Sequence, residues 1–203
     1  MFDDYLRALK DRLLAPLARR LGGMVHPNAV TVIGFVVGMG SAGAGARGAY
    51  TLGLMLWLVN RFLDGFDGTV ARASGRQSDF GGYLDIVLDF AVYAAIPIGF
   101  AIAAASRTTI LAAVVLVGVF YVNAASWMYL AALLERRALG AAANGELTSV
   151  TMPPGLVAGT ETAVAYTLFF IWPGHIVLLF GAMAVLVAAT VAQRLVWAWR
   201  ILR

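Results

Sequence analysis

The sequence predicts an all-α membrane protein in which six transmembrane helices follow an N-terminal interfacial amphipathic helix. The 203 residues are 61% hydrophobic and only 13% charged, with a mean hydropathy of +0.82, which is a membrane composition. Six apolar stretches are each about 20 residues long, the length that crosses a bilayer at 1.5 Å per residue. The absence of cysteine excludes disulfides, thiolate catalysis and cysteine metal ligands.

The first element, residues 1–22, alternates apolar and charged side chains. Leucines such as Leu6, Leu9 and Leu13 are interleaved with acidic and basic residues, so we expect a cytosolic helix in the membrane interface, interrupted near Pro16. No uninterrupted apolar core or cleavage site precedes His26, which argues against a signal peptide. We expect residues 23–203 to form a single six-helix transmembrane domain.

The six predicted spans are residues 29–47, 50–73, 82–105, 109–134, 154–172 and 175–199. Most arginines and lysines flank one side of these spans, whereas Arg47 and Arg107 lie in the opposite turns. The positive-inside rule therefore places the N-terminus in the cytosol. Because the basic residues flank apolar segments, the bilayer with its anionic lipids is the expected partner, and nucleic acid is not.

The second and third spans carry four aspartates at their adjoining ends: Asp64, Asp67, Asp85 and Asp89. Carboxylates inside a membrane segment are costly and indicate a functional site. Each pair lies on one face of its helix, so two packed helices would bring all four together near the cytosolic membrane surface. Such oxygen ligands suit two Mg²⁺ or Mn²⁺ ions. Arg61, one turn before Asp64, is expected to neutralise a motif carboxylate.

Small residues and one cation accompany these aspartates: Gly68, Ala71, Gly81 and Arg72. The glycines and the alanine would let a ligand approach the backbone, and the arginine would face phosphate. The complete pattern is D-x2-D-G-x2-A-R-x8-G-x3-D-x3-D. It resembles the signature of the CDP-alcohol phosphatidyltransferase family at every specified position.

The resemblance implies a reaction and roles for these residues. Members of the family transfer the phosphatidyl group of CDP-diacylglycerol to the hydroxyl of a small polar alcohol, and they release CMP. By resemblance, Asp64, Asp67 and Asp85 would bind the metal ions. Asp89 would be the general base, and it is also counted among the candidate metal ligands. The implied CDP-binding residues are Thr31, Asp64, Gly68, Ala71, Arg72 and Gly81.

Thr31 enters this set because P27-N28-A-V-T31 resembles the segment that opens the first span in the family. A simpler interpretation is a helix start with Asn28 near the cap. The resemblance also implies a homodimer in the bacterial inner membrane, with the active site facing the cytosol.

The acceptor alcohol is expected to contact the later spans, with Glu161 and Asn123 as candidate residues. Relatives that use glycerol phosphate carry lysines in a G-K-x-K-T stretch, where this chain has G159-T-E161-T162. A carboxylate repels phosphate, so an unphosphorylated acceptor is expected. The G-T-E-T stretch resembles a bacterial branch of the family. Alternatively, Glu161 forms a salt bridge to Arg136 or Arg137, or a hydrogen bond to Asn123.

Two other functions remain open from the sequence. One is a choline- or ethanolamine-type phosphotransferase, in which the CDP-linked group is the head group and diacylglycerol is the acceptor. The other, from a different class, is a divalent-cation carrier or channel that uses the same carboxylates.

Overall fold

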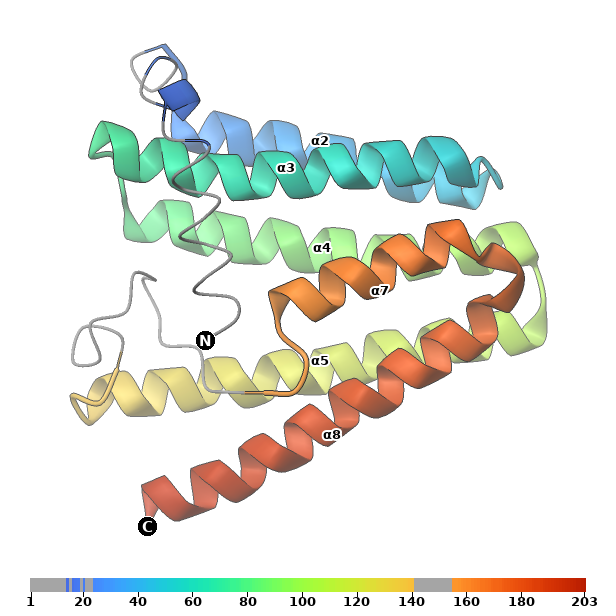
Figure 1. Ribbon diagram of the computed structural model, residues 1–203. Helices are drawn as coiled ribbons and strands as arrows, with labels where there is room; N and C mark the ends of the chain where they lie inside the picture. The colour runs from blue at the N-terminus through green and yellow to red at the C-terminus, as the bar shows by residue number, and fades with distance from the viewer. Residues whose placement is uncertain (1–13, 15, 19, 21–23, 141–154) are drawn as a thin grey trace.

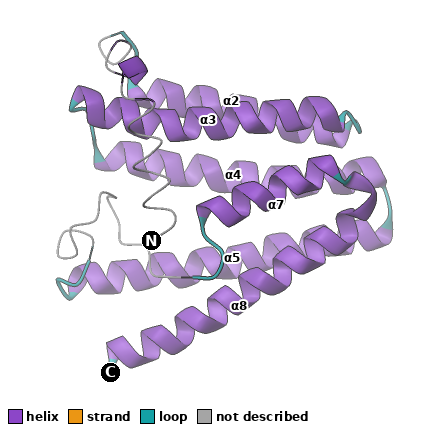
Figure 2. Cartoon of the chain, in the orientation of Figure 1, coloured by secondary structure: helices purple, strands orange, loops and turns teal. Residues whose placement is uncertain are grey.

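The computed structural model describes residues 14, 16–18, 20, 24–140 and 155–203, and these residues form helices without a strand (Figures 1 and 2). The helices are α2 (Pro27–Ala46), α3 (Tyr50–Ser74), α4 (Asp79–Ala104), α5 (Arg107–Arg136), α7 (Gly159–Ile171) and α8 (Ile176–Leu202). A short 3₁₀ helix, η1 (Pro173–His175), joins the last two. The predicted all-α class is confirmed.

Each predicted span overlaps one of these helices, but the boundaries differ, and capping residues explain two of the differences. α4 begins at Asp79 because the Ser78 hydroxyl accepts the backbone N–H of Gly81 at 3.1 Å. α5 begins at Arg107 because Ser106 accepts the N–H of Thr109 in the same way. Such side-chain caps satisfy N–H groups that the first helical turn leaves unpaired.

Within the described residues, four helical segments are long and apolar enough to cross a membrane: α2, α4, α5 and the η1–α8 unit. α3 is long enough, but Arg61, Asp64 and Asp67 lie within its apolar stretch. α7 has 13 residues, and at 1.5 Å per residue it reaches only about 20 Å of a hydrocarbon core about 30 Å thick. The chain is therefore a helical membrane protein, and its described part has four segments of spanning length and composition.

Glycines bring α2 close to α3 and α4, the three helices that surround the carboxylates. A Cβ on Gly99 would lie 2.5 Å from the backbone oxygen of Ala42. A Cβ on Gly38 would lie 2.7 Å from Val92 and 2.9 Å from the amide nitrogen of Asn60. Such positions exclude any side chain, and small residues commonly permit this close packing between membrane helices.

Aromatic side chains join α7 to this three-helix unit. The Trp57 indole N–H donates to the Thr167 hydroxyl at 3.1 Å, and the Tyr166 hydroxyl donates to the backbone oxygen of Tyr93 at 2.7 Å. The Trp57 and Tyr166 rings stack with centroids 5.3 Å apart. These contacts fix the short helix α7 against α3 and α4, while α8 runs alongside α5 (Figure 1).

The predicted N-terminal amphipathic helix lies mostly outside the described residues. The members that are described, residues 14, 16–18 and 20, are helical, and Ala18 is fully buried in a cluster with Val30, Phe66 and Val70. The interfacial helix over residues 1–22 stays a prediction.

Candidate active site

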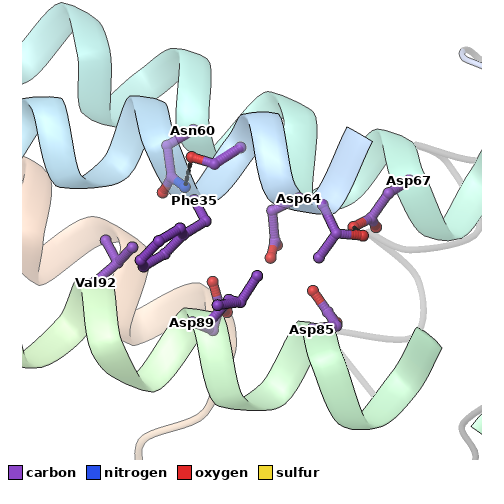
Figure 3. A pocket seen from close by; sticks show the side chains of 10 residues that line it. Phe35, Asn60, Asp64, Asp67, Asp85, Asp89 and Val92 are labelled. Atoms are coloured by element: carbon purple, nitrogen blue, oxygen red, sulfur yellow. Dashed lines mark hydrogen bonds between the residues drawn. The ribbon is translucent and has the colours of Figure 1, made fainter. Parts of the chain in front are cut away.

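A pocket lies between the end of α3 and the beginnings of α2 and α4. Figure 3 shows carboxylates from α3 and α4 directed into the space between these helices. Its lining combines the predicted aspartates with polar and apolar neighbours: Thr31, Gly34, Phe35, Asn60, Asp64, Asp67, Asp85, Leu88, Asp89 and Val92. The structure thus brings the four aspartates together, as the spacing predicts.

The turn between α3 and α4 explains this convergence. α3 ends at Gly75, whose positive φ of 64° allows its N–H to return to the Ala71 and Arg72 carbonyls, and Ser78 then starts α4. Asp67 and Asp85 are each about nine residues from the middle of the turn, and Asp64 and Asp89 each about twelve. Along the two antiparallel helices, Asp67 therefore lies at the same height as Asp85, and Asp64 at the same height as Asp89.

Thr31 connects α2 to this site. Its hydroxyl lies 2.6 Å from Oδ2 of Asp67, a residue that is only 6% exposed, and 3.2 Å from the Pro27 carbonyl. The helix-start interpretation is confirmed as well, because α2 begins at Pro27 and Asn28 lies next to the cap. The N-cap is His26, whose Nδ1 accepts the Asn28 backbone N–H at 3.2 Å.

Arg61 forms the ion pairs that the sequence predicts. Its Nη2 donates to Oδ1 of Asp89 at 2.6 Å and its Nη1 donates to Oδ2 at 3.3 Å, while Nη1 lies 3.6 Å from Oδ2 of Asp64. One guanidinium thus binds both oxygens of Asp89, an arrangement that fixes the orientation of the carboxylate.

The small residues of the motif lie closer to the turn than the carboxylates and are not part of the pocket lining. A Cβ on Gly68 would lie 3.2 Å from Nη1 of Arg72, so the guanidinium folds over this glycine. A Cβ on Gly81 would lie 3.2 Å from Oδ1 of Asn28 and from the Ser78 hydroxyl. Ala71, like Arg72, is partly exposed. These positions form a rim beside the pocket that could admit a flat or charged ligand.

The carboxylate oxygens of this pocket are suitable ligands for a divalent cation. Four carboxylates line the pocket, and among the described residues of that lining there is no basic side chain. No group of three acidic or histidine side chains in the described ranges has the geometry of a formed metal centre. Thr31 engages one oxygen of Asp67, whereas Arg61 engages both oxygens of Asp89, so Asp89 would have to adjust to bind an ion. The metal assignment stays a prediction.

The two acceptor candidates lie outside the pocket lining. Oε2 of Glu161 accepts the backbone N–H of Ala158 at 3.0 Å and so caps the first turn of α7. Asn123 Oδ1 accepts from Nη1 of Arg194 at 2.8 Å. Glu161 forms neither the predicted salt bridge to Arg136 or Arg137 nor the hydrogen bond to Asn123; Arg137 instead donates to carbonyls at the end of α8.

Arg194 is a buried polar residue that was not among the site residues expected from the sequence. This residue on α8 is only 5% exposed and donates from Nη1 to Asn123 and, also at 2.8 Å, to the Ser126 hydroxyl. Its Nε is buried without a hydrogen-bond partner. The signal was present in the sequence, because a single arginine in an apolar span needs a compensating partner or ligand.

Comparison with known families decides what kind of protein carries this site. The sequence model of the CDP-alcohol phosphatidyltransferase family matches residues 24–199, almost the whole described chain. The chain belongs to the CDP-alcohol phosphatidyltransferase family. The motif resemblance is confirmed, and the protein is an enzyme of the transferase class.

Individual relatives agree with that assignment. The transferase is 34% identical over 162 residues to the inner membrane protein YnjF of Escherichia coli, covering 78% of this chain and 77% of that protein. It is 37% identical over 106 residues to the phosphatidylinositol phosphate synthase of Streptomyces avermitilis, a match that covers 50% of this chain and 43% of the synthase.

A solved structure has the same fold. The crystal structure of Mycobacterium tuberculosis phosphatidylinositol phosphate synthase (PgsA1) with CDP-DAG bound matches with a TM-score of 0.72 and 22% identity. The match covers 93% of this chain and 94% of that one. The transferase therefore shares its helical architecture with a phospholipid-synthesising enzyme.

Proposed function

We propose that this transferase moves the phosphatidyl group of CDP-diacylglycerol to the hydroxyl of a small polar alcohol and releases CMP. The observation that carries the proposal is the convergence of four motif carboxylates from α3 and α4 on one pocket, in a chain that belongs to this family. The structure of the mycobacterial enzyme with CDP-DAG bound supports the choice of donor.

In the proposed mechanism Asp64, Asp67 and Asp85 bind two Mg²⁺ or Mn²⁺ ions, and Asp89 is the general base. The ions would neutralise the donor diphosphate and make its phosphorus more electrophilic. Asp89 removes the proton of the acceptor hydroxyl while that oxygen attacks phosphorus, and the bond to CMP breaks. The mycobacterial synthase was also crystallised with manganese and citrate, which supports a divalent metal here.

The CDP group is proposed to lie over the rim beside the carboxylates. Gly68, Ala71 and Gly81 would leave room for it, and the guanidinium of Arg72, which folds over Gly68, would face its phosphates. Thr31 and Asp64 complete the proposed CDP site, and the Thr31 hydroxyl already lies within hydrogen-bond distance of Asp67.

For the acceptor we propose an unphosphorylated alcohol that contacts Glu161 and Asn123. The carboxylate of Glu161 replaces the lysines expected for a phosphorylated substrate. A second candidate is inositol phosphate. It is favoured by the name of the Streptomyces relative and by the buried guanidinium of Arg194, which could face a phosphate.

The setting proposed for this reaction is the bacterial inner membrane. A six-span subunit with a cytosolic N-terminus and active site, and with residues 1–22 as the interfacial helix, fits the positive-inside distribution. The homodimer is proposed from the family resemblance alone. The relative named as an inner membrane protein supports this location. The choline- or ethanolamine-type reaction and the cation channel are not favoured, because the chain belongs to the transferase family and the Streptomyces relative is named as a phosphatidylinositol phosphate synthase.

Release of CMP by the purified protein tests the proposal. CDP-diacylglycerol and Mg²⁺ or Mn²⁺ would be supplied with inositol, inositol phosphate, serine, glycerol phosphate, ethanolamine or choline, with Asp85→Ala as the inactive control. Release that depends on an unphosphorylated alcohol is expected. Release with inositol phosphate alone would establish the second candidate. Activity only with CDP-choline or CDP-ethanolamine and diacylglycerol would overturn the proposed direction of transfer.

A further inference from the structure

Each guanidinium nitrogen of Arg61 donates a hydrogen bond to a side chain of α3 or α4. Nε donates to Oδ1 of Asn60 at 2.9 Å, Nη1 to the Tyr93 hydroxyl at 2.8 Å, and Nη2 to Asp89 at 2.6 Å. The guanidinium carbon, Cζ, lies over two aromatic rings, 4.6 Å from the centroid of Trp57 and 5.2 Å from that of Tyr93. The side chain is only 15% exposed. Contacts on several sides of the guanidinium therefore fix the position of Arg61.

The groups that hold Arg61 are themselves fixed. Asn60 is 2% exposed and donates to the Gly34 carbonyl of α2 at 2.9 Å (Figure 3). Trp57 is fixed by Thr167 of α7, and the backbone of Tyr93 accepts from Tyr166. Residues of α2, α3, α4 and α7 thus form a frame around the guanidinium. The frame would hold Arg61 in place even without Asp89, so the arginine sets the orientation of the carboxylate.

The four carboxylates differ in their relation to this frame. Asp89 receives two guanidinium nitrogens, whereas Asp64 lies at 3.6 Å from Nη1, beyond a good hydrogen bond. Asp67 is held by Thr31 of another helix, and Asp85 shares the pocket without a salt bridge to Arg61. The site is asymmetric, with one carboxylate bound at both oxygens by a fixed cation.

We propose that Arg61 is a positioning residue that orients Asp89 toward the acceptor hydroxyl and prevents Asp89 from coordinating a metal ion. Asp64, Asp67 and Asp85 then remain as the metal-binding set. The inference rests on the proposed role of Asp89 as general base. Lysine cannot replace the arginine fully, because an ammonium group lacks the planar fork that reaches both oxygens of Asp89 together with Asn60 and Tyr93.

Kinetics of Arg61→Gln, Arg61→Lys, Asp89→Asn and the double variant test the proposal in the purified full-length protein. Arg61→Gln should lower kcat about 100-fold, within the usual range for general-base catalysis, and change KM for CDP-diacylglycerol less than about threefold. Arg61→Lys should recover part of kcat. If Arg61 acts through Asp89, the double variant should be no slower than Asp89→Asn alone. Arg107→Gln, at an exposed position at the start of α5, is the matched control.

Mn²⁺ titration without substrate gives a second readout. Arg61→Gln should bind Mn²⁺ at least as tightly as the wild type, because Asp89 becomes available as a ligand, and most of any gain should disappear in the double variant. A tenfold weaker Mn²⁺ affinity in Arg61→Gln, unchanged kcat, or additive losses in the double variant would each overturn the proposal. If the wild type releases no CMP with any acceptor, the proposed function fails, and the titrations still decide the role of Arg61.

Discussion

At the residue scale, each motif carboxylate is distinguished by the side chain it contacts. Asp67 and Asp89 share a residue type and one pocket, but Asp67 accepts from the hydroxyl of Thr31, whereas Asp89 accepts from the guanidinium of Arg61. The hydroxyl of Thr31 brings no charge to Asp67, whereas the fixed guanidinium of Arg61 offsets the charge of Asp89. Equivalent positions in the motif thus acquire different chemical properties.

Thr31→Val should weaken the metal site while preserving the shape of α2. Loss of a buried hydroxyl leaves an oxygen of Asp67 without this donor, at a cost of about 1–3 kcal/mol, or roughly a 5- to 150-fold loss of Mn²⁺ affinity. Thr31→Ser retains the hydroxyl and is the control. Equal Mn²⁺ affinity in the valine variant and the wild type would show that the contact does not organise the site.

Asp89→Asn should bind CDP-diacylglycerol almost as well as the wild type and lose about 10²–10⁴-fold in turnover, the range for removal of a general base. Asp85→Asn should instead lose metal affinity. Equilibrium binding of the lipid nucleotide together with single-turnover CMP release separates the two effects. If Asp89→Asn loses binding and metal dependence together, Asp89 is mainly a ligand.

At the element scale, glycines and capping residues determine where helices begin and how closely they approach. Gly99 places α4 against the backbone of α2 at Ala42, and Ser78 starts α4 at the position that brings Asp85 and Asp89 opposite α3. Glu161 performs the corresponding capping role for α7. The site depends on these local features because a shift of α4 would move two of its carboxylates.

Gly99→Ala should lower both thermal stability and activity, since its Cβ would lie 2.5 Å from a backbone oxygen that has little freedom to move. Gly118→Ala is the matched control, because a Cβ at this position of α5 meets no atom within 4 Å. Overpacking of this kind costs about 1–3 kcal/mol. Thermal unfolding in detergent measures the difference. Equal melting temperatures for the two variants would contradict the tight α2–α4 contact.

Glu161 caps α7 in the structure and is proposed to contact the acceptor alcohol. One substitution distinguishes the two roles. Glu161→Gln retains an oxygen that can accept the Ala158 N–H, so the melting temperature should stay close to that of the wild type. KM for the acceptor alcohol should rise about tenfold, as expected when a charged hydrogen-bond partner is replaced. An unchanged KM would restrict Glu161 to capping.

At the scale of the whole molecule, the aromatic contacts of α7 join the three-helix unit of the carboxylates to the later helices. Trp57 and Tyr93 of that unit contact Thr167 and Tyr166, while Arg194 links α8 to α5. The proposed donor and acceptor regions therefore belong to one connected framework. The proposed membrane orientation of that framework, with the active site in the cytosol, rests on the positive-inside rule.

The absence of native cysteine allows a direct test of this topology. Gln77→Cys lies in the exposed turn after α3, and Thr108→Cys lies at the exposed start of α5. With a cytosolic active site, an impermeant maleimide should label Thr108→Cys in intact cells and Gln77→Cys only after permeabilisation. The reverse pattern would place the active site on the outer face.

The sequence alone determined the helical class, the family and the four carboxylates, because the motif is local to two helices joined by a short turn. Periodicity along each helix fixes which aspartates share a face, and the turn brings both faces together. Arg61 could be expected to neutralise some carboxylate, but only the tertiary structure assigned it to Asp89, paired Thr31 with Asp67 and joined Arg194 to Asn123. These contacts depend on how helices that are distant along the chain are rotated and how deeply they lie in the membrane. Packing at glycines and aromatic rings determines both, and the local spacing of residues in the sequence does not encode them.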